Sequence, residues 1–163
     1  MDKKSALFKS SLQPASKVIV SCRDLNGRDN ALVVAYCGNC SFDPPMVMVG
    51  IVPSRFSHHM VKESGCFVVN LPCKDNKALY DYVGSQSGKD GDKLKAVGAK
   101  VSNAKTIDAP VLDECPVNIE CKVVNSIMTG SHEMFIGEIT HVHADASITA
   151  DDGKIDFSKI DFI

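Results

Sequence analysis

The stretch KVIVSCRDLNGRDNALVVAY, residues 17–36, carries the clearest structural signal in this chain of 163 residues. Residues 17–22 are rich in β-branched side chains, which are stiff and pack well on a pleated sheet. Asn26 and Gly27 follow, and an Asn-Gly pair accepts the positive φ angles of a tight hairpin turn at little cost. Residues 30–36 then read as the returning strand. We therefore predict that the chain opens with a β-hairpin.

Four further strands are predicted from the spacing of apolar side chains. Residues 46–52 are apolar on both faces, which is typical of a central strand, and residues 66–71 form another short apolar run. In residues 117–123 apolar and polar side chains alternate, which indicates a strand with one buried face. Residues 134–143 are expected to pair with it after a turn at residues 126–133.

A helix is predicted over residues 54–63, where apolar side chains recur with helical spacing. Ser54 is expected to cap its N-terminus and Gly65 to end it. His58 and His59 are expected on the helix surface and the helix face, respectively. Two short helical segments are predicted at residues 76–83 and 92–97. Residues 37–45 are predicted as a polar loop and residues 84–91 as a flexible linker.

Short strands separated by turns, with a few short helices, indicate a mainly β fold: a small closed barrel with helical insertions. The length suits one domain, residues 1–163, with residues 1–14 and 150–163 as peripheral tails. The segment from residue 151 onward is polar with spaced apolar residues. It is expected either to dock on the barrel or to stay partly disordered.

The charge balance excludes several classes of function. There are 18 basic and 20 acidic residues and no basic stripe, so we expect no nucleic-acid binding. The longest apolar run, residues 46–52, is too short to span a bilayer. Lysines interrupt the first 17 residues, so no signal peptide is expected. We expect a cytoplasmic protein whose seven cysteines are mainly small buried hydrophobic residues.

Two clusters could in principle hold a metal or form a redox pair. Cys37 and Cys40 have CxxC spacing, but the Asp-Pro-Pro that follows prevents the helix of a thioredoxin-type site, and no second CxxC completes a zinc site. The sequence alone does not exclude a redox pair there. His141, His143 and Asp145 share one strand face through alternation alone, and no further ligand follows. We therefore expect no metal site.

Seven short landmarks occur in order along the chain. They are Asn30-Ala31, SFDPP at 41–45, Pro53-Ser54-Arg55, FVVNLP at 67–72, SGKD at 87–90 with Lys93, ECPVN at 114–118, and His132 leading into FIGE at 135–138. Each is weak alone, but together they resemble the flavin reductase-like, FMN-binding split-barrel family, and most closely its flavoredoxin members, over residues 17–145. The resemblance implies a split β-barrel, a Greek-key barrel with short helical insertions.

The resemblance also implies that the protein holds flavin mononucleotide (FMN). The phosphate is assigned to the predicted helix start, because unpaired N–H groups and the helix dipole favour an anion there. Arg55 and Ser57 are the expected ligands, with Ser54 beside them and Lys93 as a second cation. A guanidinium group suits this role because it forks onto phosphate oxygens. Without the resemblance, the same residues would read as an ordinary capped helix with surface cations.

The flavin ring is assigned to the first hairpin and the segment after it. The expected contacts are Asn30, Ala31, Tyr36, Asn39, Cys40 and Ser41. Members of the family often have Trp where Tyr36 stands, so stacking area is expected to be smaller here. His132 is expected to contact the flavin and to orient the nicotinamide donor, as the one candidate catalytic side chain. Taken alone, Asn30 would read as a turn residue and Tyr36 as a core residue.

The function implied by the resemblance is hydride transfer from NADH or NADPH to FMN in a homodimer. The electrons then pass to a free flavin, a metal complex or a redox protein. Two alternatives remain at this stage: an FMN-bound electron carrier without nicotinamide turnover, and a small barrel that binds haem, a metal or another ligand. No dinucleotide-binding GxGxxG motif and no hydrolase motif occurs in the chain.

Overall fold

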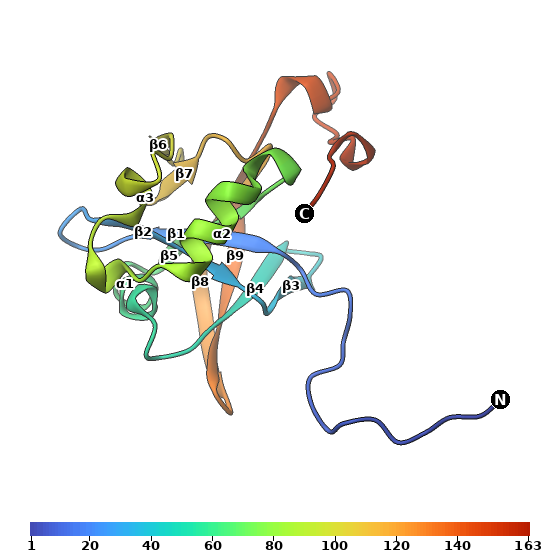
Figure 1. Ribbon diagram of the computed structural model, residues 1–163. Coiled ribbons are helices and arrows are strands. Elements are labelled where there is room, and N and C mark those ends of the chain that lie inside the picture. Colours follow the sequence, from blue (N-terminus) through green and yellow to red (C-terminus); the bar gives the residue numbers. More distant parts are fainter.

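The computed structural model describes residues 1–163. The fold is built on a seven-stranded antiparallel sheet, in which the strands follow the order β2-β1-β5-β8-β9-β4-β3 (Figure 1). Its strands are β1 (Val18–Arg23), β2 (Asp29–Val34), β3 (Cys37–Ser41), β4 (Met46–Ile51), β5 (Cys66–Leu71), β8 (Val117–Thr129) and β9 (His132–Ala144). A second sheet pairs β6 (Val101–Asn103) with β7 (Pro110–Leu112). The helices are α1 (Phe56–Ser64), α2 (Lys77–Ser85) and α3 (Lys93–Ala96).

The large sheet curls around one apolar core. Val34 of β2, at one edge of the sheet, and Val49 of β4, near the other edge, are buried in the same cluster. This cluster also contains the fully buried Phe67 and Phe135, and Met60 from α1 packs into it. Because residues from both ends of the sheet share one interior, the strands form a barrel, and the mainly β fold is confirmed.

Helices α2 and α3 cover the outer face of the β1–β2 hairpin (Figure 1). Alternation along β2 decides which side chain faces where: Ala31 points outward and is buried against Leu79 and Leu94, whereas Val34 points into the barrel. The hairpin is therefore covered on both faces. Its position is fixed between the barrel core and the two helices.

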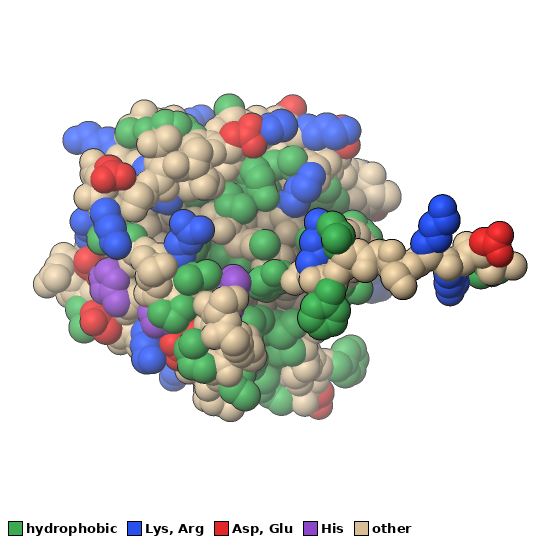
Figure 2. All heavy atoms as spheres, turned by 60° about the horizontal axis from the view of Figure 1, so that its bottom comes forward, with side chains coloured by type: hydrophobic (Ala, Val, Ile, Leu, Met, Phe, Trp, Pro, Cys, Tyr) green, Lys and Arg blue, Asp and Glu red, His purple; other side chains and the backbone are tan.

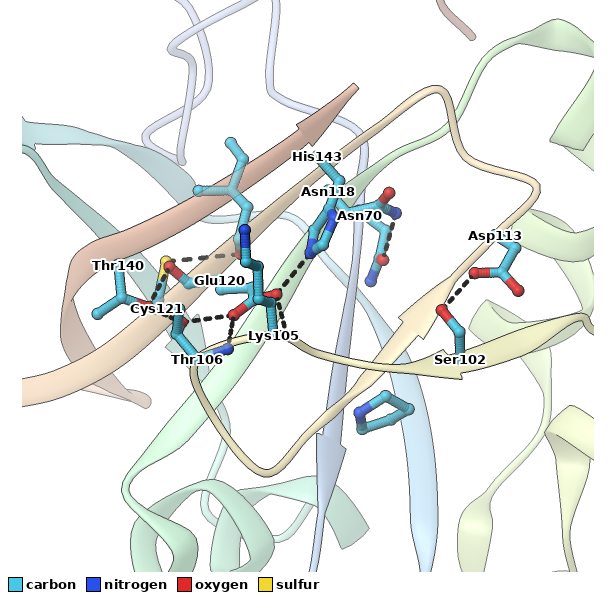
Figure 3. Close-up of polar contacts among 12 residues, drawn as sticks. Asn70, Ser102, Lys105, Thr106, Asp113, Asn118, Glu120, Cys121, Thr140 and His143 are labelled. Carbon is cyan, nitrogen blue, oxygen red and sulfur yellow. Dashed lines mark hydrogen bonds and ion pairs between the residues drawn. The ribbon is translucent and has the colours of Figure 1, made fainter. Parts of the chain in front are cut away.

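A buried carboxylate anchors the loop between β6 and β7 to the large sheet (Figure 3). Glu120 of β8 is fully buried and accepts hydrogen bonds from the N–H groups of Lys105 at 2.6 Å and Thr106 at 2.7 Å. The Thr106 hydroxyl and His143 Nε2 each lie 2.5 Å from the same carboxylate. Burial alone raises the pKa of Glu120, but these hydrogen bonds outweigh it and lower the pKa to about 2.

The predicted strands are all present, but several details of the prediction were wrong. The first turn lies where DLNGRD predicts it, as a loop of residues 24–28 with Gly27 at positive φ, 83°, although Asn26 does not share that conformation. Residues 37–41, expected to be loop, form β3, an edge strand that pairs with β4 alone. Strands β8 and β9 run almost to their shared turn, which takes only residues 130–131 instead of 126–133.

The ends of the chain behave differently from each other. Residues 1–17 are exposed; the N-terminal end runs away from the barrel (Figure 1), whereas Ser10 and Ser16 bond Tyr36 and Cys37 beside β3. The C-terminal segment docks: Ile148 and Ile160 are buried against Val117, and Phe162 pairs with Cys73. Docking is thus the outcome of the two that the sequence left open. No helix of the chain is long and apolar enough to cross a membrane.

Candidate functional site

A cleft of about 180 Å³ lies between the start of α1, strand β2 and the segment that follows α2. It collects four of the residues selected from the sequence: Asn30, Arg55, Ser57 and Lys93. Ser85 and Ser87 line the opposite wall. The cleft therefore combines two cations with three hydroxyl side chains beside a helix N-terminus.

Helix α1 presents a free N-terminus to this cleft. Arg55 is its N-cap residue and has an extended backbone, with φ −72° and ψ 141°, and no side chain accepts a hydrogen bond from the first turn. The expected cap by Ser54 is therefore wrong, and Ser54 is exposed and does not line the cleft. First-turn N–H groups without a side-chain cap are suited to binding an anion. The end of the helix was predicted correctly, because Gly65 has φ 71° there.

Asn30 and Ser57 bind each other at the cleft wall. The side-chain N–H of Asn30 donates to the Ser57 hydroxyl at 2.7 Å, and both residues are buried. This bond joins β2 to the first turn of α1. Its role in the free protein is to hold the helix start in place, while the Ser57 hydroxyl proton remains available to a neighbouring acceptor.

Lys93 enters the cleft from α3 as a buried cation. Its Nζ donates to the carbonyl oxygens of Val83 at 2.9 Å and Gln86 at 3.0 Å, and the residue is 6% exposed. An ammonium group has three donors, so one N–H remains for a ligand. Burial, helped by the nearby Arg55 charge, lowers the pKa of Lys93 to about 8.

Tyr36 and His132 form a second group outside this cleft. Their rings meet edge to face with centroids 4.7 Å apart, and Tyr36 is 43% exposed rather than buried in the core. The Ser131 hydroxyl lies 2.8 Å from His132 Nδ1. The pair joins the start of β9 to the segment before β3 and leaves aromatic surface open to a planar ligand.

The remaining predicted ring contacts lie elsewhere. Asn39, Cys40 and Ser41 lie along β3 and line a separate open hollow of about 540 Å³. Ala31 is fully buried against α2 and α3, so its side chain does not reach the cleft, and only its backbone is near Asn30. All seven cysteines are free thiols, and burial raises the pKa of Cys37 to about 11.

Sequence reasoning missed the ion pair behind α1. His58, expected on the helix surface, is buried with its Nε2 2.6 Å from Glu133 Oε2, and His59 is the exposed one. Glu133 also accepts from Ser126 at 2.7 Å and Lys62 at 3.3 Å. These hydrogen bonds, that from Ser126 foremost, lower the pKa of Glu133. His58 follows Ser57, and Glu133 follows His132, so this contact connects the two groups of candidate residues.

The cleft residues fit a phosphate group. Arg55 and Lys93 supply charge, and Ser85, Ser87 and the α1 N-terminus supply donors of the kind that phosphate oxygens accept. The cleft is smaller than the roughly 300–1,000 Å³ that enclose a whole small ligand. It therefore suits the phosphate end of a nucleotide, and the rest of such a ligand has to lie outside it.

Comparison with known proteins gives concordant results. The flavin reductase-like domain matches residues 11–154 of the chain. The structure superposes on flavoredoxin of Desulfovibrio vulgaris (Miyazaki F) with a TM-score of 0.90 and 31% sequence identity, over 97% of this chain and 85% of that one. An uncharacterised protein of Archaeoglobus fulgidus is 34% identical over 132 residues, which cover 80% of this chain and 73% of that protein.

A more distant relative has a named activity. The NADH:riboflavin 5'-phosphate oxidoreductase of Streptomyces pristinaespiralis is 25% identical over 126 residues, which cover 77% of this chain and 69% of that protein. The domain match covers most of the chain, and the barrel described above has the shape of the flavoredoxin structure. The chain belongs to the flavin reductase-like family of flavin-binding split-barrel proteins.

Proposed function

We propose that this protein binds FMN and passes electrons from NADH or NADPH through the flavin to an acceptor. The observation that supports this most is the cleft, in which Arg55 and Lys93 converge beside the uncapped N-terminus of α1. Such a site favours a dianionic phosphate over a neutral group. Among the flavins, FMN ends in such a phosphate and riboflavin does not.

Bound FMN would supply the redox chemistry, and the side chains supply binding and orientation. Arg55 and Lys93 hold the phosphate, and the Asn30–Ser57 bond fixes the first turn of α1 against β2. The exposed edge strand β3 offers unpaired backbone groups at Asn39, Cys40 and Ser41 to the polar edge of the ring. Tyr36 and His132 form an aromatic wall against which the ring and the donor are oriented.

Two named proteins support this proposal. The Streptomyces pristinaespiralis relative is named for NADH and riboflavin 5'-phosphate, and the Desulfovibrio vulgaris protein is a flavoredoxin. They favour, respectively, an enzyme with nicotinamide turnover and an electron carrier. We propose the enzyme, because His132 stands beside Tyr36 on an accessible surface where a second planar ring could stack.

The visible spectrum of the purified protein and a turnover assay test the proposal together. We expect flavin absorption after FMN is added, and steady-state oxidation of NADH or NADPH with free flavin as acceptor. An FMN-loaded protein that oxidises neither nucleotide would favour the carrier. A colourless protein that FMN does not saturate would contradict both forms of the proposal.

We also propose a cytoplasmic homodimer that delivers electrons to a flavin or a redox protein. The free end of the β8–β9 hairpin extends beyond the barrel and exposes Val124, Ile127 and Met128. Figure 2 shows hydrophobic side chains gathered on the face where this hairpin end comes forward. An exposed apolar surface of this kind is suited to a symmetric contact with a second copy.

A further inference from the structure

The wall of the cleft opposite α1 is formed by residues 83–88, most of which belong to the segment 84–91 that was expected to be a flexible linker. That expectation was wrong, because the segment begins as the end of α2, continues into a short 3-10 turn at Gly88–Asp90, and packs the buried Gly88 against the barrel. A Cβ atom on Gly88 would lie 2.5 Å from Phe56 Cδ1 and 2.9 Å from Asn30 Oδ1, and one on Gly84 would lie 3.1 Å from Val33 Cγ2. Gly88 accepts no side chain unless Phe56 or Asn30 moves, so its backbone closes the cleft at this point, whereas Gly84 is only a tight fit.

Arg28 holds this wall from outside the cleft. Its Nη2 donates to the carbonyl oxygens of Gly88 and, at 3.3 Å, Gly91. Its guanidinium carbon lies 4.6 Å from the centroid of the Phe56 ring, a cation–π contact. The backbone N–H of Arg28 is itself fixed by the Asp24 carboxylate at 2.9 Å. One side chain from the β1–β2 loop thus clamps the 84–91 segment and the first residue of α1 together.

The bonding of Arg28 distinguishes it from the other two arginines. Arg23 pairs with Asp29 and Asp108, and Arg55 lines the cleft. Arg28 forms no salt bridge, and its charge is met only by two carbonyl groups and an aromatic face. A planar guanidinium group makes such a combination, whereas a lysine offers only a point charge. This arrangement is that of a clamp between two walls of one site.

We propose that Arg28 is a positioning residue that fits the cleft to a terminal phosphate monoester and thereby selects FMN over FAD. A monoester needs one opening, through which the rest of the ligand enters. A dinucleotide continues beyond its phosphates and needs a second opening. In this proposal the continuation is blocked at the close contact of Gly88 with Phe56 and Asn30, which Arg28 holds in place. This inference rests on the proposed binding of FMN.

Calorimetric titration of the full chain with riboflavin, FMN and FAD tests the proposal. For Arg28→Ala we expect the FMN dissociation constant to rise about tenfold or more, because the wall that carries Ser87 and Gly88 is no longer held against α1, with riboflavin unchanged. The preference for FMN over FAD should shrink by about the same factor. Lys95→Ala is the matched control, because Lys95 is an exposed cation on α3 that does not line the cleft.

The outcomes separate this inference from the proposed function. If the wild-type chain does not bind FMN, the proposed function fails. If it binds FMN but Arg28→Ala leaves the FMN-to-FAD preference intact, or weakens riboflavin and FMN equally, the inference is wrong and Arg28 is merely structural. If Arg28→Ala does not fold, Arg28→Lys decides the matter, because it keeps the charge but loses the planar group that lies on the Phe56 ring while it bonds the wall. The same narrowed preference is expected, and an unchanged one overturns the proposal.

Discussion

Lys93 is the residue whose charge state matters most to the site. Its pKa of about 8 means that the free protein carries this charge at neutral pH and loses it as the pH rises further. The phosphate of FMN is fully ionised above about pH 7, because its second pKa is about 6. We therefore predict that FMN affinity falls as the pH is raised from about 7 to about 9.5, and that riboflavin affinity does not.

Fluorescence titrations across this pH range measure the effect. Lys93→Met should bind FMN more weakly at pH 7 and should show a flatter pH profile than the wild-type chain. An FMN profile that parallels that of riboflavin would show that Lys93 does not contact the phosphate.

The buried carboxylate of Glu120 is expected to make the stability of the fold depend on pH. Its pKa of about 2 lies below the ordinary value of 4.5, so the folded state binds its proton less readily than the unfolded state does. The stability it contributes is complete above about pH 4.5 and is lost as the pH falls toward about 2. Glu120→Gln should lower the free energy of unfolding at pH 7 by about 1–3 kcal/mol, because a neutral amide replaces a carboxylate with several donors.

Urea unfolding at several pH values checks this. The difference in free energy of unfolding between wild type and Glu120→Gln should narrow between pH 5 and pH 2.5. A constant difference would mean that the carboxylate charge contributes nothing. Glu138→Gln, on the neighbouring strand β9 and without a salt bridge, is the control and should leave the unfolding curve almost unchanged.

Some residues of the cleft could be identified from the sequence alone. Arg55, Ser57 and Lys93 were found because ordered landmarks surround them, and the structure brings them into one cleft. Arg28 and the wall serines, Ser85 and Ser87, were missed, because their place depends on segments far apart in the chain that meet only in the fold. Two local signals were present: SGKD at 87–90 counted only as a landmark, and the small polar residues of GSQSG at 84–88 were interpreted as flexibility.

The β8–β9 hairpin is the element that connects the two groups of candidate residues. Glu133 at the start of β9 binds His58 and Lys62 of α1 and Ser126 of β8. Removing the carboxylate leaves the buried His58 ring and the Ser126 hydroxyl without their hydrogen-bond partner, which costs about 1–3 kcal/mol. We predict that Glu133→Ala lowers the free energy of unfolding by about this amount and loosens the position of His132.

Chemical denaturation measures the change in the free energy of unfolding, and the NMR chemical shift of the His132 ring reports whether that side chain has moved. Glu138→Ala, which removes a carboxylate from the same strand, should change neither. If Glu133→Ala unfolds at the same urea concentration as wild type, the ion pair does not hold the hairpin.

Strands were predictable where apolar residues alternate with polar ones or run together, although in β8 the polar side chains Asn118 and Glu120 are buried as well. The alternation in residues 117–123 revealed the first half of β8, whereas residues 125–129 are exposed and carry no pattern that reports a partner. Strand β3 consists of small residues at a sheet edge, and β6 and β7 have three residues each. Such short or edge strands are defined by pairing across the fold, which a local window of sequence does not contain.

At the scale of the whole molecule, the exposed apolar end of the β8–β9 hairpin leads us to predict that two copies of the chain associate. Val124, Ile127 and Met128 are about half exposed, and no other part of the chain covers them. We predict that Ile127→Asp together with Met128→Asp converts a dimer into a monomer, because two carboxylates cannot be buried without partners. Light scattering coupled to size exclusion measures the mass. Val142→Asp, at an exposed apolar site elsewhere on β9, should remain dimeric, and a monomeric wild type would contradict the prediction.

The barrel as a whole was predictable because its interior strands, its opening hairpin and its family landmarks all point to one architecture. The closure of the sheet was not visible in any single segment. It follows from residues of β2 and β4 sharing one core, although these strands lie near opposite ends of the sheet order.

The most direct test of the account is the binding of FMN and riboflavin to the Arg55→Ala, Lys93→Ala double variant. We predict that FMN affinity falls by several kcal/mol, at about 1.5–3 kcal/mol for each charged hydrogen bond, while riboflavin affinity stays the same. FMN affinity equal to that of the wild-type chain would show that the phosphate is not held in this cleft.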